Sequence, residues 1–155
     1  MVLPLRPNVC ILLINQDNLL FLGERYQESG HWQFPQGGCE PDFSEESNVL
    51  RELNEELGAP PESFDIIKKL QARYDYDWKS PPAYAIGKWR GQSQSFWLVR
   101  FSGQDSDIDL NAHEPEFMNW RWCTVEQVKK LAFSRRLKGY LPALEEFKAW
   151  LQAQA

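Results

Sequence analysis

The sequence contains few of the side chains that build metal clusters or disulfide frameworks. It has three cysteines and two histidines among its 155 residues. Cys10, Cys39 and Cys123 match no spacing typical of a zinc site, and their odd number disfavours a set of disulfides. His31 and His113 are isolated in the sequence, and we assign no role to either. We therefore expect reduced thiols in a cytoplasmic protein.

The sequence also lacks a long hydrophobic run near its start and an excess of positive charge. The apolar run at residues 9–14 is too short to span a bilayer or to form the core of a secretory signal. The formal net charge is −5, whereas extended surfaces that bind nucleic-acid phosphates are usually basic. We expect no membrane partner and no DNA partner, although a local basic pocket is compatible with this charge.

What the chain does have is enough apolar material for one folded domain over residues 1–155. Hydrophobic residues make up 43% of the sequence and aromatic residues 14%, which suffices for a core at this length. The seven tryptophans are many for such a chain. They are either large core residues or parts of a pocket.

A helix is expected from Ser44 to Leu57. Ser44 is a good N-cap, and Glu45 and Glu46 fall in the first turn, where the helix dipole favours negative charge. Gly58 suits the position just after the helix and is expected to be structural. The apolar residues share the face that should dock on the core: Val49, Leu50, Leu53 and Leu57.

Three glutamates lie on a neighbouring face of this helix. Glu52, Glu55 and Glu56 are spaced i, i+3 and i+4, so their carboxylates fall close together. Such a triplet is either a solvated acidic face or a site for a divalent cation that removes the repulsion. Carboxylate oxygens favour Mg²⁺, Mn²⁺ or Ca²⁺ over zinc.

The remaining pattern indicates an α/β fold in which a mixed sheet is sandwiched between helices. A capping box at 124–127 begins a short helix, and a last helix is expected over 141–154 with Pro142 near its start. Strands are expected over residues 9–14, 19–25, 66–76 as one or two strands, 95–101 and 117–123.

The stretch GGCEPDFSEESNVLRELNEELGA, residues 37–59, resembles the Nudix box. Two positions depart from the family pattern, because Phe43 stands where the family has its first glutamate and Ala59 replaces a larger aliphatic residue. The resemblance implies the same α/β/α sandwich over nearly the whole chain. The positions that match in register are Gly37, Arg51, Glu52, Leu53, Glu55, Glu56 and Gly58.

Four further segments are similar to one subfamily, the RNA pyrophosphohydrolases and dinucleoside polyphosphate hydrolases. They are LRPNVCILL at 5–13, WQFPQGG at 32–38, GQSQSFWLVRF at 91–101 and PEFMNWRW at 115–122. Their occurrence in the same order is more specific than the box alone.

The resemblance implies cleavage of a phosphoanhydride with Mg²⁺, or with Mn²⁺ in its place. We expect Glu52, Glu55 and Glu56 to be catalytic metal ligands, because a polyphosphate beside three carboxylates needs cations between them. The carbonyl of Gly37 or Gly38 is expected to add a ligand. The resemblance also places Glu116 near the metals, as a ligand or as the general base. Glu114, two residues away, is its rival.

Arg51 is expected to be structural. In the family it pairs with the glutamate that Phe43 replaces, so another carboxylate should take that place. Asp42, Glu46 and Glu55 are the candidates, the last through its i+4 spacing from Arg51.

Substrate-binding residues are expected outside the helix. Arg6 and Arg25 match arginines of the subfamily and suit phosphate contacts, and Gln36 belongs to the WQFPQGG segment. Phe133 or Tyr76 could stack on a base, although core packing is an equal alternative. Further candidates are Tyr74 and Trp78 for stacking, and the basic residues Arg135, Arg136 and Lys138.

Three functions are therefore compatible with the sequence. The first is removal of pyrophosphate from 5′-triphosphate RNA, which leaves a 5′-monophosphate. The second is hydrolysis of diadenosine tetraphosphate or a related dinucleoside polyphosphate. The third is a catalytically weak nucleotide- or RNA-binding module on the same scaffold, to which Phe43 gives some weight.

Overall fold

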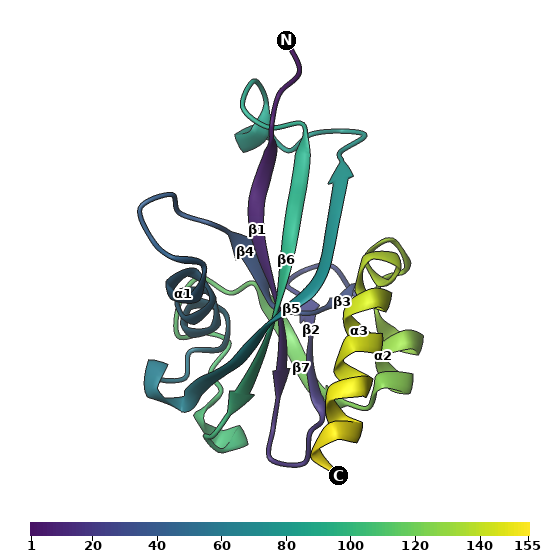
Figure 1. Ribbon diagram of the computed structural model, residues 1–155. Helices are drawn as coiled ribbons and strands as arrows, with labels where there is room; N and C mark the ends of the chain where they lie inside the picture. Colours follow the sequence, from purple (N-terminus) through teal and green to yellow (C-terminus); the bar gives the residue numbers. More distant parts are fainter.

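A computed structural model describes all 155 residues. Its mixed sheet lies between α1 on one side and α2 with α3 on the other, as predicted (Figure 1). The strands are β1 (Leu5–Ile14), β2 (Leu20–Arg25), β3 (Trp32–Gln33), β4 (Gln36–Gly38), β5 (Phe64–Asp77), β6 (Gly91–Phe101) and β7 (Phe117–Cys123). The helices are α1 (Glu45–Leu57), α2 (Val125–Leu131) and α3 (Ser134–Gln154), with 3₁₀ turns at Pro61–Ser63, Ala83–Ala85 and Asp105–Asp107.

The centre of the sheet is a parallel pair formed by β1 and β6. They are paired along the whole of β1, from Leu5 opposite Gly91 to Ile14 opposite Arg100. The main order of strands is β3-β2-β1-β6-β5, while β4 pairs with β1 and β7 pairs with β2. All strand pairs other than β1 with β6 are antiparallel.

Strand β1 contributes to two separate cores, which explains its continuous apolar run. Cys10 and Leu12 pack into the core beneath α2 and α3, whereas Val9 and Ile11 pack into the core beneath α1. Alternate side chains of a strand point to opposite faces, so a strand covered on both sides needs apolar residues throughout.

Helix α1 has the predicted ends and the predicted buried face. The Ser44 hydroxyl accepts a hydrogen bond from the Ser47 N–H at 3.1 Å, and Gly58 closes the helix with a left-handed φ of 73°. Val49, Leu53 and Leu57 are fully buried. The helix is therefore fixed at both ends and along one face, which places its glutamates.

Helix α3 begins earlier than predicted, at Ser134, and contains Pro142 in its interior. A proline inside a helix costs about 3 kcal/mol, yet burial of Tyr140, Leu144 and Phe147 on one face offsets that cost. A Cβ on Gly139 would lie 2.3 Å from the Tyr74 ring, so this glycine lets α3 approach β5 closely.

Several predicted strands are longer in the structure. Strands β1 and β6 begin earlier, at Leu5 and Gly91, and residues 66–76 belong to the one strand β5 with register irregularities. Local sequence pattern underestimates strands whose ends carry polar side chains facing a pocket. No helix in the structure is both long and apolar enough to cross a membrane.

Candidate active site

A cavity of about 440 Å³ opens beside α1 at the end of the sheet where β4 and β6 begin. Glutamates and arginines both line it, so the cavity presents both charges to an occupant. Its residues are Arg6, Asn8, Arg25, Gln36, Gly37, Gly38, Glu52, Glu55, Tyr76, Trp78, Pro82, Tyr84, Gln92, Glu116 and Arg136. The structure thus brings together most of the residues that the sequence predicts for the site.

The three helix glutamates differ in their exposure. Glu55 is exposed, whereas Glu52 is 8% exposed and Glu56 is 2% exposed. Burial raises the pKa of Glu52 to about 7, with Arg51 opposing the shift and Glu55 and Glu116 adding to it. Burial and the charges of Glu52 and Glu116 raise the pKa of Glu56 well above its ordinary value. The predicted carboxylate face is therefore partly buried.

Charged side chains lie directly against the backbone of Gly37 and Gly38, so a side chain at either position would have to displace them. A Cβ on Gly37 would lie 2.0 Å from the Glu52 carboxyl carbon, and a Cβ on Gly38 would lie 2.2 Å from the Arg6 guanidinium carbon. Neither glycine has a positive φ. The Gly38 carbonyl accepts a hydrogen bond from Arg51 Nη2 at 3.1 Å.

The acidic side chains offer the donor atoms that a hard divalent cation needs. Glu56 Oε2 is buried and has no hydrogen-bond partner, although an uncompensated buried carboxylate is costly. As they lie, no three acidic, histidine or cysteine side chains converge closely enough to enclose a metal ion. The carboxylate oxygens are nevertheless the donor type that such a cation prefers.

Of the two rival glutamates near β7, only Glu116 lines the cavity. It lies immediately before β7, and its backbone carbonyl accepts the Tyr26 N–H at 2.9 Å. The Glu116 charge also contributes to the raised pKa of both Glu52 and Glu56. Glu114 is exposed and lines neither cavity.

Two predicted arginines line the same cavity as the carboxylates, and each has a partner. The Arg6 guanidinium lies 4.7 Å from the centre of the Tyr84 ring, and its Nη1 donates to the Tyr84 hydroxyl at 3.1 Å. Trp78 packs edge-on against Tyr84. Arg25 forms an ion pair with Glu28. The aromatic residues of the loop between β5 and β6 therefore hold one phosphate-binding candidate in place.

The floor of the cavity is a network of amide side chains from β1, β4 and β6. Gln94 donates to Asn8 and to Gln36, Asn8 donates to Gln92, and Gln92 donates to the Tyr76 hydroxyl. Asn8, Gln92 and Gln94 are buried. A satisfied buried network fixes the positions of the groups at its ends, which here include Gln36 and Tyr76.

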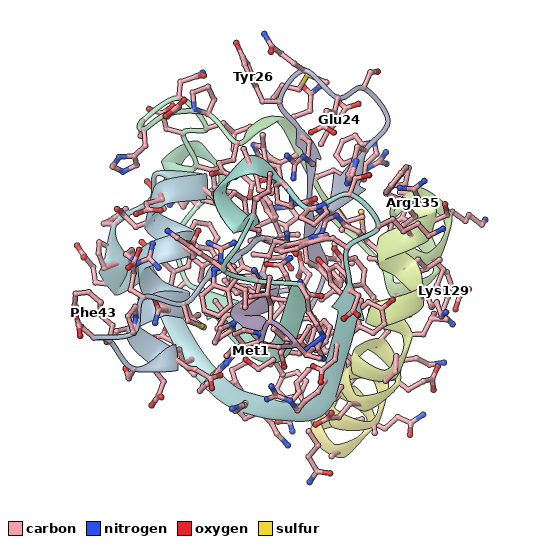
Figure 2. The ribbon with its side chains drawn as sticks, turned by 90° about the horizontal axis from the view of Figure 1, so that it is seen from above. Met1, Glu24, Tyr26, Phe43, Lys129 and Arg135 are labelled. Carbon is pink, nitrogen blue, oxygen red and sulfur yellow. The ribbon has the colours of Figure 1, made fainter.

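A second cavity of about 740 Å³ adjoins the first, with Tyr76, Trp78 and Arg136 lining both. Phe133 lies here, stacked on His31 at 4.1 Å between ring centres. The other lining residues are Tyr74, Asp77, Lys79, Ser80, Gln94, Arg135 and Lys138. Figure 2 shows Arg135 projecting from the start of α3, on the opposite side of the molecule from Phe43.

His31 is a residue of this second cavity that the sequence does not identify. Arg136 Nε donates to His31 Nε2 at 3.1 Å, and burial together with Arg136 and Arg25 lowers the pKa of His31. Neutral His31 thus holds Arg136, whose Nη1 also donates to Gln36. The clue in the sequence is its position beside WQFPQGG, which alone does not reveal contacts with residues in α3.

Comparison with known proteins identifies the family. The sequence model described as NUDIX domain matches residues 4–144. A protein of Sphingopyxis alaskensis named RNA pyrophosphohydrolase is 38% identical over 151 residues, which cover 94% of each chain. A protein of Rickettsia rickettsii with the same name is 35% identical over 156 residues, covering 97% of this chain and 94% of that one.

Solved structures show the same fold at lower sequence identity. A Caenorhabditis elegans Ap4A hydrolase in a binary complex superposes with a TM-score of 0.66 at 21% identity, covering 94% of this chain and 98% of that chain. The Escherichia coli dihydroneopterin triphosphate pyrophosphohydrolase gives a TM-score of 0.65 at 14% identity, covering 91% and 97%. The family match over residues 4–144, together with relatives that are 35–38% identical along nearly the whole chain, shows that the chain belongs to the Nudix family.

Proposed function

We propose that this chain hydrolyses a phosphoanhydride bond at the 5′ end of triphosphorylated RNA and releases pyrophosphate. The observation that carries the proposal is a cavity in which arginines lie beside Glu52 and Glu55, next to a second cavity lined by aromatic and basic residues. A polyphosphate suits the first cavity and unstacked bases suit the second. The names of its relatives support the same substrate.

The residues of the first cavity divide the work between binding and charge control. We propose that Glu52, Glu55 and the Gly37 carbonyl hold Mg²⁺ or Mn²⁺ together with the buried Glu56, which does not itself line the cavity. The cation, when bound, would neutralise phosphate charge and activate a water. Arg6 and Arg25 bind phosphate groups other than the one that the water attacks. Glu116 enters the cavity from the start of β7 and either joins the metal ligands or removes a proton from the attacking water.

The second cavity supports RNA over a short nucleotide, because it offers two stacking surfaces and several cations. Phe133, backed by His31, and Tyr76, held by Gln92, are available for bases next to the cleaved phosphates. Arg135 and Lys138 lie beside them and suit backbone phosphates. A dinucleoside polyphosphate would also fill both cavities and is the second candidate.

The deciding experiment compares 5′-triphosphate RNA with diadenosine tetraphosphate under the same Mg²⁺ concentration. We expect higher kcat/KM on the RNA, with pyrophosphate as the released product. A large preference for the dinucleotide would replace the first proposal with the second. Binding of both without hydrolysis of either would indicate a nucleotide- or RNA-binding module instead.

Substitutions of Glu116 and Glu114 are expected to show that only Glu116 takes part in catalysis. Glu116→Gln should lower kcat by about 10²- to 10⁴-fold, the range that a positioned acid or base contributes. Glu114→Gln should leave kcat unchanged, since its side chain lies outside both cavities. Steady-state rates of the two variants under saturating Mg²⁺ test this, and equal rates would remove Glu116 from the proposed site.

Loss of the Tyr84 ring is expected to weaken substrate binding through Arg6. The ring and hydroxyl contacts together contribute about 1–2 kcal/mol, so Tyr84→Ala should raise KM about 5- to 30-fold with little change in kcat. Tyr84→Phe keeps the ring and should have a smaller effect. Tyr26→Ala is the matched control, because Tyr26 lines neither cavity, and a KM increase of the same size there would contradict the role of Tyr84.

A further inference from the structure

Arg51 has an unusual set of partners in this chain. Phe43, the residue at the position where the family has a glutamate, is 60% exposed and lies at the outer margin of the molecule beside α1 (Figure 2). Its side chain has no acceptor for a guanidinium. Arg51 Nη1 instead donates to Glu52 Oε1 at 3.0 Å and to Glu55 at 3.5 Å. Of the expected substitutes, Asp42 and Glu46 make no bond to Arg51, and Glu55 accepts only two long bonds, both at 3.5 Å.

The shortest bond of Arg51 goes to a residue that the sequence does not single out. Asn48 Oδ1 accepts Arg51 Nη2 at 2.7 Å. Asn48 is one turn earlier on α1, at the i, i+3 spacing that brings side chains together. It is fully buried, which is rare for an asparagine unless its polar atoms are satisfied.

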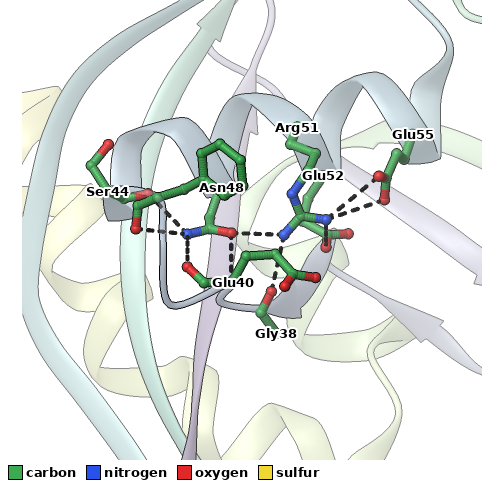
Figure 3. A network of polar contacts seen from close by, with 8 residues as sticks. Gly38, Glu40, Ser44, Asn48, Arg51, Glu52 and Glu55 are labelled. Atoms are coloured by element: carbon green, nitrogen blue, oxygen red, sulfur yellow. Dashed lines mark hydrogen bonds and ion pairs between the residues drawn. The ribbon is translucent and has the colours of Figure 1, made fainter.

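Asn48 satisfies its polar atoms by holding the loop that leads into α1. Its Oδ1 also accepts the Glu40 N–H at 2.9 Å. Its Nδ2 donates to the Ser44 carbonyl at 2.9 Å and approaches the carbonyls of Glu40 and Phe43 at 3.4 Å. Figure 3 shows Asn48 between this loop and Arg51. One amide therefore connects the loop to the guanidinium.

We propose that Asn48 is a positioning residue of the metal site, and that it performs through Arg51 the bracing that residue 43 does not supply. Through Nη2 and Nη1, Arg51 contacts the Gly38 carbonyl and the Glu52 carboxylate (Figure 3). Both groups border the proposed cation site. Asn48 thus fixes the guanidinium, and the guanidinium fixes two oxygen atoms next to that site.

The alternative role for Asn48 is purely structural, as a clamp on the start of α1. The two roles use different atoms, because Nδ2 binds the loop carbonyls and Oδ1 binds Arg51 and the Glu40 N–H. Asn48→Asp keeps the acceptor and removes the donor, whereas Asn48→Ala removes both. We expect the metal affinity to depend on the Oδ1 acceptor alone. The stability of the metal-free chain should depend on both the Oδ1 acceptor and the Nδ2 donor.

The test is Mn²⁺ affinity measured by calorimetry on the metal-free full chain, with the melting temperature recorded separately. Asn48→Ala is expected to weaken Mn²⁺ binding about 10- to 100-fold, the usual effect of removing a group that orients metal ligands. Asn48→Asp should retain the wild-type affinity even though its melting temperature falls. Asn54→Ala is the matched control, because Asn54 lies on α1 and its side chain bonds only the Ala59 carbonyl, at 3.0 Å.

A second variant tests whether Asn48 performs the task of residue 43. The backbone of Phe43 lies beside Asn48, and Arg51 Nε is buried with no partner. Phe43→Glu should therefore restore Mn²⁺ affinity in the Asn48→Ala background. In the wild-type background, Phe43→Glu alone should change the Mn²⁺ affinity by no more than about twofold.

The role of Asn48 rests on the proposed metal site, and the outcomes distinguish failure of the metal site from failure of the role of Asn48. If the wild-type chain binds no Mn²⁺, both the site and the role of Asn48 are overturned. If wild type binds Mn²⁺ and Asn48→Ala binds it equally well, or weakens only as much as Asn54→Ala, the role of Asn48 alone is overturned. Loss of affinity in Asn48→Ala with recovery in Asn48→Asp and in the double variant would establish it.

Discussion

A Glu56→Gln variant is expected to lose about 10²- to 10⁴-fold in kcat and yet to be more stable than the wild-type chain when metal is absent. Stabilisation by a bound metal is worth several kcal/mol, which corresponds to that range of rates. The stability effect has the opposite sign, because the new amide is neutral at a position where a buried carboxylate beside Glu52 and Glu116 is unfavourable.

Activity assays with Mg²⁺ and thermal melts with a chelator measure the two effects on the same preparation. Glu46→Gln is the control, since Glu46 is an exposed residue of the first turn of α1. It should change neither property appreciably. A Glu56→Gln variant that keeps wild-type hydrolysis would refute metal-assisted catalysis at this site.

The carboxyl groups of Glu52 and Glu56 are expected to make the metal-free chain less stable as the pH rises from 4.5 to about 7, and Mg²⁺ is expected to reverse this loss. The lowered pKa of His31 acts in the opposite direction, and this contribution is common to wild type and Glu56→Gln. The pKa of Glu52 rises from its ordinary value of 4.5 to about 7 in the fold. Between these values the folded chain binds more protons than the unfolded chain, so the free energy of unfolding falls with increasing pH. The raised pKa of Glu56 acts in the same direction.

Melting curves from about pH 4.5 to about pH 8, with chelator and with Mg²⁺, measure this linkage. At the upper end of that range a cation present at about 100 times its Kd should raise the melting temperature by about 5–10 °C. The difference between wild type and Glu56→Gln isolates the contribution of the buried carboxylate from that of other groups. Parallel pH profiles for these two proteins would contradict the expected coupling.

The parts of the fold that depend on neighbouring residues could be read from the sequence. Helix α1 has Ser44 at its start, Gly58 after its end and an apolar face between them, and each signal acts within a few residues. The predicted start of α3 is wrong, because Pro142 indicates a helix start locally whereas burial of Tyr140 against the sheet favours continuation. Tertiary packing outweighs the local preference there.

The candidate site also has features that local sequence predicts and features that depend on tertiary packing. The spacing of Glu52, Glu55 and Glu56 predicts their common face, but their unequal burial depends on the Gln36–Gly38 strand lying over them. Asn48 and Arg51 are spaced i, i+3 on the helix, so their contact is compatible with the sequence. Charge alone, however, predicts a nearby carboxylate as the partner of Arg51. Only the path of the loop from Glu40 to Ser44, which passes over Asn48, selects the amide.

The parallel pairing of β1 with β6 has a consequence for synthesis on the ribosome. Asn8 and Gln94, which are bonded across this pair, are 86 residues apart in the chain. At roughly 5–20 residues per second, translation of that interval takes on the order of ten seconds. Throughout that time the apolar segment from Val9 to Ile14 has no parallel partner, and an unpaired apolar strand of this kind is prone to aggregate until β6 has been made.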